Sequence, residues 1–546
     1  MDFPGLIGTT GFYTPFSLKA EAQTCKNLYL ERVESGAGRN PFVLMKSPGL
    51  KNFSTDTAPT KQVCRGFLEL ADHLFDVQDD VIYDIDADGD IIATYSPIAD
   101  DGLLVSMAAS QNSLFVVSGS ILYRINGGAM TLPVTPFTPM AVVQIAGYIV
   151  CLATTGRRFF FSTDDGVTWN ALDFQTLETD LPNKLVNIIV DHEEMWVFCN
   201  RNAQVYVVGD NPDAPFVRVS SGQIMMGLAA KNALAAMDNS LFWLGKDHNG
   251  EHMVWRANGY TPLRISTHAI ENAIRSYAAH DDAIMQTYQL NGHSCLRLTF
   301  PSANSGLGVT WEYDVSTNAW GEVAWWNMEA GRYERHRGNC YVSAFGKTLV
   351  GDYANGLIWQ MSPDFYTDYG YPLRWERRTP HITKDGKRVQ YKRFEVAMQV
   401  GVGTTTPVWM NDLSLDRAAF DAAVTAQVAL GTVTVQQALL LTYIYLFQPY
   451  NQDVALPPPS VMTPLGFYDY GNRPQVALRW SNDGGETFGA YRNRDMGRYG
   501  DYNQRIYWGG IGTLGMGRDR VWELSSEAPV KTAIVQGIFD AEACLT

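Results

Sequence analysis

The stretch Ser162-Thr-Asp-Asp-Gly-Val-Thr-Trp169 fits the template Ser-x-Asp-x-Gly-x-Thr-aromatic, and so does Ser481-Asn-Asp-Gly-Gly-Glu-Thr-Phe488. In such a segment the Ser and Asp side chains can accept hydrogen bonds from backbone N–H groups, and Gly supplies a positive φ. The aromatic ring packs beneath the bend. This pattern is the Asp box, a hairpin turn found mostly in β-propellers and related sheet repeats. It predicts turns held by Ser162, Asp164, Gly166, Trp169, Ser481, Asp483, Gly485 and Phe488.

The middle of the chain repeats a phrase of polar turn, apolar strand, second turn and second strand. Its apolar anchors are separated by 35 to 54 residues, and they are Leu74, Leu114, Ile149, Met195, Leu241, Cys295 and Leu349. A four-stranded propeller blade takes roughly 40 to 50 residues. The sequence therefore predicts an all-β fold, with a β-propeller of six or seven blades over residues 60–370. A β-sandwich, with turns every 8 to 12 residues or so, ranks second.

The flanking segments have a different character. We expect residues 1–59 to form an extended or β segment that closes onto the propeller or onto a neighbouring subunit. The sequence predicts a β-rich C-terminal domain over residues 371–402 and 473–546. It predicts a partly helical insertion over residues 403–472. The apolar run Ala438–Phe447 in that insertion must be buried against its own domain, a neighbouring subunit or a pore constriction.

Composition describes a globular chain. Of 546 residues, 46% are hydrophobic and 18% charged, and no run predicts a membrane span or a signal peptide, so folding in a cytoplasm is expected. The seven cysteines are odd in number, widely spaced and mostly within apolar strands, which predicts buried thiols. A net charge of −15 argues against tight binding of nucleic acid. It suits the wall of a pore through which DNA slides, and it equally suits a large protein that acidity keeps soluble.

Motifs for chemistry are mostly missing, so neither catalytic residues nor a cofactor are predicted. One weak candidate for calcium exists at Asp84, Asp86 and Asp88, where alternate aspartates precede a glycine as in an EF-type loop. The twelfth position, which needs a bidentate Glu, holds Tyr95. An Asp-rich hairpin is therefore the better interpretation.

One dense basic segment lies in this acidic chain. Two interpretations stay open for it: docking to an acidic partner or DNA backbone, and a solvated hairpin face. We expect it to lie on a protein interface, so that reversing Arg377 and Arg378 to Glu would block assembly and leave monomers folded. Its members are Arg374, Arg377, Arg378, Lys384, Lys387, Arg388, Lys392 and Arg393.

Several phrases, in order along the chain, resemble the packaged-DNA stabilisation proteins of short-tailed bacteriophages. Residues 403–472 show no such phrase. The phrases include Cys25-Lys-Asn-Leu-Tyr29, Lys46-Ser-Pro-Gly-Leu50, Arg264-Ile-Ser-Thr-His-Ala-Ile-Glu271, Thr310-Trp-Glu-Tyr-Asp314, Arg377-Arg-Thr-Pro-His-Ile382 and Gly517-Arg-Asp-Arg-Val-Trp-Glu-Leu524.

The resemblance implies a tail hub or nozzle protein of the virion, assembled in the host cytoplasm and without catalytic residues. Such a protein forms a ring, generally a homohexamer, below the portal and its head-completion adaptor. Its further partners would be tail fibre, spike or needle proteins and the packaged double-stranded DNA, which passes through the lumen without tight binding. The alternative is a sialidase-like glycosidase, or a glycan- or receptor-binding tail protein, built on a propeller with Asp boxes. A sialidase needs arginines, a Tyr nucleophile and acidic partners around the central face.

Overall fold

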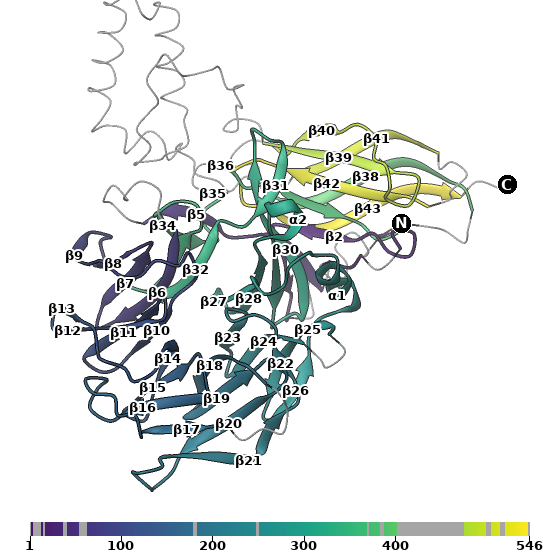
Figure 1. Cartoon of the computed structure of the whole chain (residues 1–546). Coiled ribbons are helices and arrows are strands. Elements are labelled where there is room, and N and C mark those ends of the chain that lie inside the picture. Colours follow the sequence, from purple (N-terminus) through teal and green to yellow (C-terminus); the bar gives the residue numbers. More distant parts are fainter. Residues whose placement is uncertain are drawn as a thin grey trace, which may run out of the picture. The chain divides into compact units, whose positions relative to one another are not determined.

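The computed structural model describes residues 2–3, 12–14, 17–35, 41–53, 63–177, 183–246, 250–368, 371–382, 387–400, 474–497, 504–513 and 519–543. The predicted insertion at 403–472 lies outside these residues. The chain divides into two compact units (Figure 1). The propeller unit comprises residues 56–320 and 334–360, and the terminal unit comprises residues 1–55, 321–333 and 361–546.

The propeller unit begins with antiparallel sheets of four consecutive strands, as predicted for an all-β fold. The strands of the first two sheets are β6 (Cys64–Leu70), β7 (His73–Gln78), β8 (Val81–Ile85), β9 (Ile91–Tyr95), β10 (Ser106–Ala109), β11 (Ser113–Ser118), β12 (Ile121–Asn126) and β13 (Ala129–Thr131). The next two contain β14 (Pro139–Ile145), β15 (Tyr148–Ala153), β16 (Arg158–Ser162), β17 (Phe174–Thr176), β18 (Leu185–Asp191), β19 (Glu194–Cys199), β20 (Ala203–Val208) and β21 (Phe216–Ile224).

Three further sheets follow along the chain. One is built from β22 (Gly227–Leu228), β23 (Leu234–Met237), β24 (Ser240–Lys246), β25 (His252–Asn258) and β26 (Thr261–Arg264). The next contains β27 (Ile284–Leu290), β28 (His293–Phe300) and β29 (Val309–Asp314), after helix α1 (His268–Arg275). The last contains β32 (Gly338–Ala344), β33 (Lys347–Asp352) and β34 (Ile358–Ser362). Strand β6 lies beside β10 and also beside β32, so the last sheet returns to the first (Figure 1).

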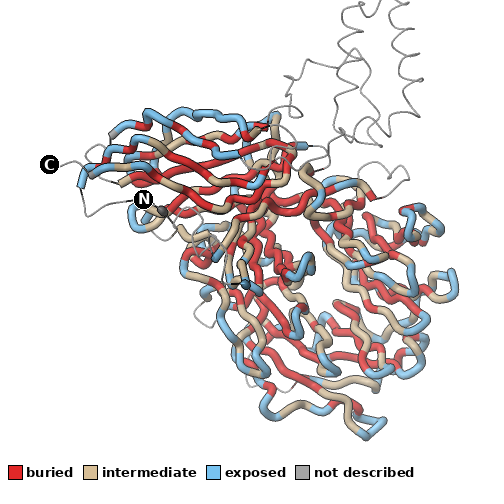
Figure 2. Tube along the Cα trace, turned by 180° about the vertical axis from the view of Figure 1, so that it is seen from behind, coloured by how far each residue is buried: buried red, intermediate tan, exposed pale blue. Residues whose placement is uncertain are grey.

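The inner strands are continuous apolar runs, because successive side chains point to opposite faces of a strand and both faces are buried. On β11, Leu114 and Val116 pack with residues of the first sheet, whereas Phe115 and Val117 pack with the third sheet. Every residue of β11 is buried, because each face of the strand meets a neighbouring sheet (Figure 2). Burying a large apolar side chain is worth about 1.5–3 kcal/mol. Packing between successive sheets thus holds the unit together.

Helix α1 interrupts the strands of this unit. Thr267 caps its first turn, since the side chain accepts a hydrogen bond from the backbone N–H of Ile270. Ala269, Ile270 and Ile274 are buried along one face. Among the described residues, no helix is long and apolar enough to cross a membrane.

The terminal unit packs two sheets around aromatic side chains. One sheet has the order β3 (Leu28–Arg32), β4 (Phe42–Lys46), β43 (Ala533–Ala543), β38 (Val389–Gln399), β41 (Arg505–Thr513). The other includes β2 (Thr24–Lys26), β37 (Trp375–Arg378), β42 (Val521–Ser526), β39 (Gln475–Ser481) and β40 (Arg492–Asp495). Phe394 and Phe539 from the first sheet stack at 4.4 Å between ring centroids, and both contact Trp522 from the second. These rings form the core that joins the sheets.

The cysteines behave as the sequence predicts. Six of them are buried and form no disulfide among the described residues: Cys25, Cys64, Cys151, Cys199, Cys295 and Cys340. Cys544 lies outside the described residues.

Candidate functional site

The basic segment enters the terminal unit as strand β37 and is largely enclosed by it. Successive residues of a strand point to opposite faces, so Arg377 and Arg378 have different surroundings. Arg377 is fully buried, and its guanidinium donates to Gln23 Oε1 at 2.8 Å and to the carbonyl oxygen of Thr24 at 3.4 Å. Burial lowers the pKa of Arg377 below its ordinary value. This side chain is closed to any partner.

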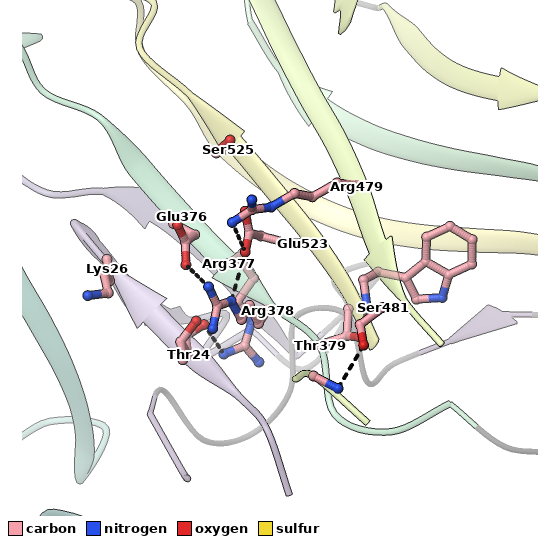
Figure 3. Close-up of polar contacts among 12 residues, drawn as sticks. Thr24, Lys26, Glu376, Arg377, Arg378, Thr379, Arg479, Ser481, Glu523 and Ser525 are labelled. Carbon is pink, nitrogen blue, oxygen red and sulfur yellow. Dashed lines mark hydrogen bonds and ion pairs between the residues drawn. The ribbon is translucent and has the colours of Figure 1, made fainter. Parts of the chain in front are cut away.

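Arg378 belongs to a cluster around a buried carboxylate, Glu523 of β42 (Figure 3). Glu523 lies between two strands, opposite Arg378 of β37 and Arg479 of β39. Arg378 Nε donates to its carboxylate at 2.8 Å and Arg479 Nε at 2.5 Å. Burial alone would raise the pKa of Glu523, but the hydrogen bond from Arg479 and the charges of both arginines lower it.

The second Asp box closes this cluster from one side. The ring of Phe488, its last residue, lies 4.7 Å from the guanidinium of Arg378 and 4.9 Å from that of Arg479. Arginine over an aromatic face gains about 0.5–1 kcal/mol or more. The box therefore supports the arginine cluster, a role that the sequence pattern did not predict.

The other members of the basic segment differ in exposure. Arg374 pairs with Glu527 at 2.5 Å, whereas Lys387 and Arg388 are exposed. Lys392 forms an ion pair with Glu542, and Arg393 pairs with Glu395 at 2.8 Å. Lys384 lies outside the described residues. The eight side chains thus do not form one continuous basic surface, and the interface prediction stays a prediction for the exposed ones.

Each Asp box is a self-contained turn. In the first box, Ser162 Oγ accepts from the N–H of Gly166 at 3.2 Å, and Asp164 accepts from the N–H of Thr168 at 3.0 Å. Gly166 has φ +69°, and Trp169 is buried beneath the turn. In the second box, Ser481 Oγ bonds the N–H of Gly485 at 2.8 Å, where φ is +97°.

The carboxylates of both boxes are held by their own turns. Burial alone would raise the pKa of Asp164, but hydrogen bonds from Ser162 and Thr168 lower it. Hydrogen bonds from Ser481 and Thr487 lower the pKa of Asp483. These side chains are engaged within the hairpin, so the boxes give no support to sugar chemistry.

We expect Asp164→Ala to destabilise the propeller unit by about 1–2 kcal/mol, because the turn loses three hydrogen bonds at a partly exposed site. Chemical unfolding of the full chain measures the change. Asp210→Ala, an exposed aspartate in the corresponding connection of the next sheet, is the control and should stay within about 0.5 kcal/mol. Equal effects of the two changes would contradict this account of the box.

The three aspartates of the weak calcium candidate do not converge. Asp84 is buried, and its carboxylate lies 2.8 Å from His73 Nδ1. Asp86 accepts from the backbone N–H groups of Asp88 and Asp90, both at 3.0 Å, as in a hairpin turn. Across the part of the chain that the structure describes, no group of three His, Cys, Asp or Glu side chains is arranged to hold a metal ion.

A buried polar cluster in the propeller unit was not predicted. Arg297 of β28 donates to Glu312 of β29 at 2.7 Å and to the hydroxyl of Tyr341 of β32 at 2.8 Å, and Tyr288 also donates to Glu312. Burial and the charge of Arg297 hold the pKa of His336 well below its ordinary value. Arg297 is 2% exposed and Glu312 is 5% exposed. Arginine, tyrosine and glutamate thus meet as a sialidase would require, but in an interior that a sugar cannot reach.

The place where the last sheet meets the first contains a second buried polar group. Cys340 of β32 donates its thiol to the carbonyl oxygen of Cys64 of β6 at 3.6 Å. Asp76 of β7 is fully buried beside them and accepts from Gln78 Nε2 at 2.5 Å. Burial raises the pKa of Asp76 to about 7.

Asp76→Asn should therefore change the pH dependence of stability. In the wild type the native state holds this proton more tightly than the unfolded chain, so stability falls as pH rises from about 4 to about 7. The variant lacks that slope and should be more stable than the wild type above pH 7, on the order of a few kcal/mol. Thermal unfolding from pH 4 to pH 8 tests this, with the exposed neighbour Asp80→Asn as control. Parallel pH profiles of wild type and D76N would refute it.

The two units differ in charge. The propeller unit has 17 Lys and Arg residues against 32 Asp and Glu, whereas the terminal unit has 25 of each. The whole net charge of −15 is thus carried by the propeller unit. In the terminal unit the basic and acidic residues are equal in number, so its net charge is zero.

Fold and site together define a β-propeller protein with a second β unit, in which the arginine cluster pairs with a buried carboxylate of the same unit. A family model described as "Bacteriophage P22 Gp10, beta-propeller" matches residues 22–366, and this chain belongs to that family of phage packaged-DNA stabilisation proteins. The family confirms both the predicted propeller and the resemblance drawn from the sequence, and it points to a structural protein of the virion.

Other comparisons are more distant. Among curated proteins, none matches the chain. The extracellular domain of the putative one component system BT4673 from B. thetaiotaomicron is 11% identical, with a TM-score of 0.38, over 59% of this chain and 41% of that one. YCF48 from Cyanidioschyzon merolae is 12% identical, with a TM-score of 0.37, over 58% of this chain and 99% of that one. The match therefore covers less than two thirds of the length of the BT4673 domain.

Proposed function

We propose that this protein is a tail hub or nozzle protein of a short-tailed phage. Copies form a closed ring, a homohexamer, below the portal and its head-completion adaptor. The ring retains the packaged DNA and conducts it during ejection, without catalysis. The observation that carries the proposal is the family match over residues 22–366, which covers most of the propeller unit.

The charge distribution supports passage of DNA. Nucleic-acid affinity comes from cations that displace phosphate counterions. The propeller unit has almost two acidic residues for each basic one, so it offers duplex DNA little to bind. A conduit needs such a surface, because a basic wall would hold the phosphates and stall movement.

The test is a phage in which an early stop codon removes this chain. We expect heads that package DNA and then lose it, seen as DNase-sensitive genomes and empty heads by electron microscopy. Supplying the chain in trans should restore full heads, with the protein in a ring at the tail. Heads that keep their DNA without the chain would overturn the proposal.

A further inference from the structure

The terminal unit exposes an arginine strip, which we define as Arg393 of β38, Arg492 and Arg494 of β40, and Arg505 of β41. Arg492 and Arg494 are exposed and reach towards β41, where they donate to the carbonyl oxygens of Gly510 at 3.3 Å and Tyr507 at 3.2 Å. The side chains of Arg393 and Arg505 are 44% and 66% exposed. Four guanidinium groups thus share one edge of the unit.

The strip is only partly neutralised by its own unit. Glu395 pairs with Arg393 at 2.8 Å and with Arg505 at 3.5 Å, whereas among the described residues no ion pair involves Arg492 or Arg494. Tyr507 is 53% exposed, and the guanidinium of Arg393 lies 4.2 Å from its ring. Exposed arginine beside exposed tyrosine is the composition enriched in protein interfaces. The Glu523 cluster differs, since its arginines already have a carboxylate.

The propeller unit presents an edge of opposite charge. In its first four sheets consecutive strands are antiparallel, so the turns after the first and third strands of each sheet lie at one edge. These turns are residues 71–72, 86–90, 110–112, 127–128, 146–147, 163–173, 192–193 and 209–215, and they contain no Lys or Arg. Their exposed acidic residues include Asp72, Asp88, Glu193, Asp210 and Asp213. We call this the acidic edge.

The opposite edge of the same sheets is mixed in charge. Its connections hold Arg157, Lys184 and Arg201, all exposed, beside four aspartates: Asp79, Asp80, Asp100 and Asp101. The acidic edge is therefore a property of one side of the blades and not of the unit as a whole.

We propose that the arginine strip of one copy docks on the acidic edge of the propeller unit in a second copy. This contact rests on the proposed ring, and it supplies the two different surfaces that a head-to-tail contact needs in order to close by rotation. The second copy is the occupant because the chain itself carries a complementary surface, whose turns contain no Lys or Arg. Of the acidic residues on that surface, Asp165 is paired with an arginine of its own unit, Arg124. Duplex DNA fits less well, since two exposed acidic residues lie beside the strip: Asp495 follows Arg494 in β40, and Asp540 of β43 is opposite Arg393 in the sheet.

The test measures self-association of the full chain with the double variant R492E/R494E, whose side chains are exposed and outside the core. We expect at least a tenfold loss of association by mass photometry. The melting temperature should fall by no more than a few degrees, since the changes remove the contact of Arg492 with the ring of Trp480 at 4.6 Å and the two exposed hydrogen bonds to β41. Wild-type association should weaken as salt rises from about 0.1 M to about 1 M. The control K184E/R201E makes the same change in net charge on the mixed edge and should associate as the wild type does.

Exchanging charges between the arginine strip and the acidic edge tests the contact directly. R492E/R494E is combined with either D72K/D88K or D210K/D213K. Association should return in the combination whose two lysines lie opposite the strip in the complex. If the wild type associates and R492E/R494E matches it, or if neither exchange restores association, this contact is overturned while the ring stands. A wild type that never self-associates would overturn the ring as well. If R492E/R494E instead removes binding of duplex DNA and leaves association intact, the strip is a DNA contact and the proposal fails.

Discussion

Arg377→Glu is expected to unfold the terminal unit. The change places a carboxylate where a buried guanidinium now donates to Gln23 Oε1 and to the carbonyl oxygen of Thr24. Both atoms are acceptors, so they cannot hydrogen-bond a carboxylate as they do the guanidinium, and Glu21 adds a further negative charge nearby. An uncompensated buried charge costs about 3–5 kcal/mol, which is a large part of the stability of most domains.

The measurement is hydrogen exchange read by mass spectrometry on the full chain. Peptides from β37 and β42 should lose protection in R377E, while peptides from β11 and β15 of the propeller unit keep it. Arg388→Glu is the matched control, since Arg388 belongs to the same basic segment and is exposed. If R377E kept wild-type protection on β37, the buried position of this side chain would be refuted.

This result would replace an expectation drawn from the sequence. The basic segment predicted that reversing Arg377 and Arg378 would block assembly and leave monomers folded. The structure gives a physical reason against that outcome, because Arg377 is fully buried and Arg378 is paired with Glu523. Loss of assembly in that double variant would report unfolding and not an interface.

The sequence predicted most of the local structure. Continuous apolar runs such as β11 predict strands that are buried on both faces. The two Asp boxes predict their turns, because the hydrogen bonds of their template Ser and Asp side chains all lie within eight residues. Helix α1 also has a local origin, because Thr267 caps its first turn and its buried residues are spaced for one face. These features depend on neighbours in the chain, so one sequence contains them.

The partners of charged residues could not be predicted, because they are set by strand register over long separations. Glu523 meets Arg378 across 145 residues and Arg479 across 44. Arg297 meets Tyr341 across 44. An arginine inside an apolar strand, as in Cys-Leu-Arg-Leu-Thr-Phe around Arg297, was the only available signal, and it does not say which carboxylate will face it.

Glu523→Ala should also lower the free energy of unfolding of the terminal unit strongly, though less than Arg377→Glu. It leaves Arg378 and Arg479 facing each other across β42 without the carboxylate that separates them. Breaking a buried pair by removing one partner costs about 3–5 kcal/mol. The two arginines are 27% and 22% exposed, so solvent screens part of the repulsion and we expect about 3 kcal/mol, near the lower limit.

Chemical unfolding of E523A and its control Glu542→Ala separates this effect from a general loss of charge. Glu542 pairs with Lys392 on the surface and is 64% exposed, so its removal should cost about 0–1 kcal/mol. The lowered pKa of Glu523 means that its contribution is fully present above the ordinary carboxyl pKa and is lost as pH falls from there through the lower pKa of the folded state. The difference between wild type and E523A should therefore shrink below about pH 4. A difference that stays constant with pH, or equal costs for E523A and E542A, would show that the two arginines do not depend on Glu523.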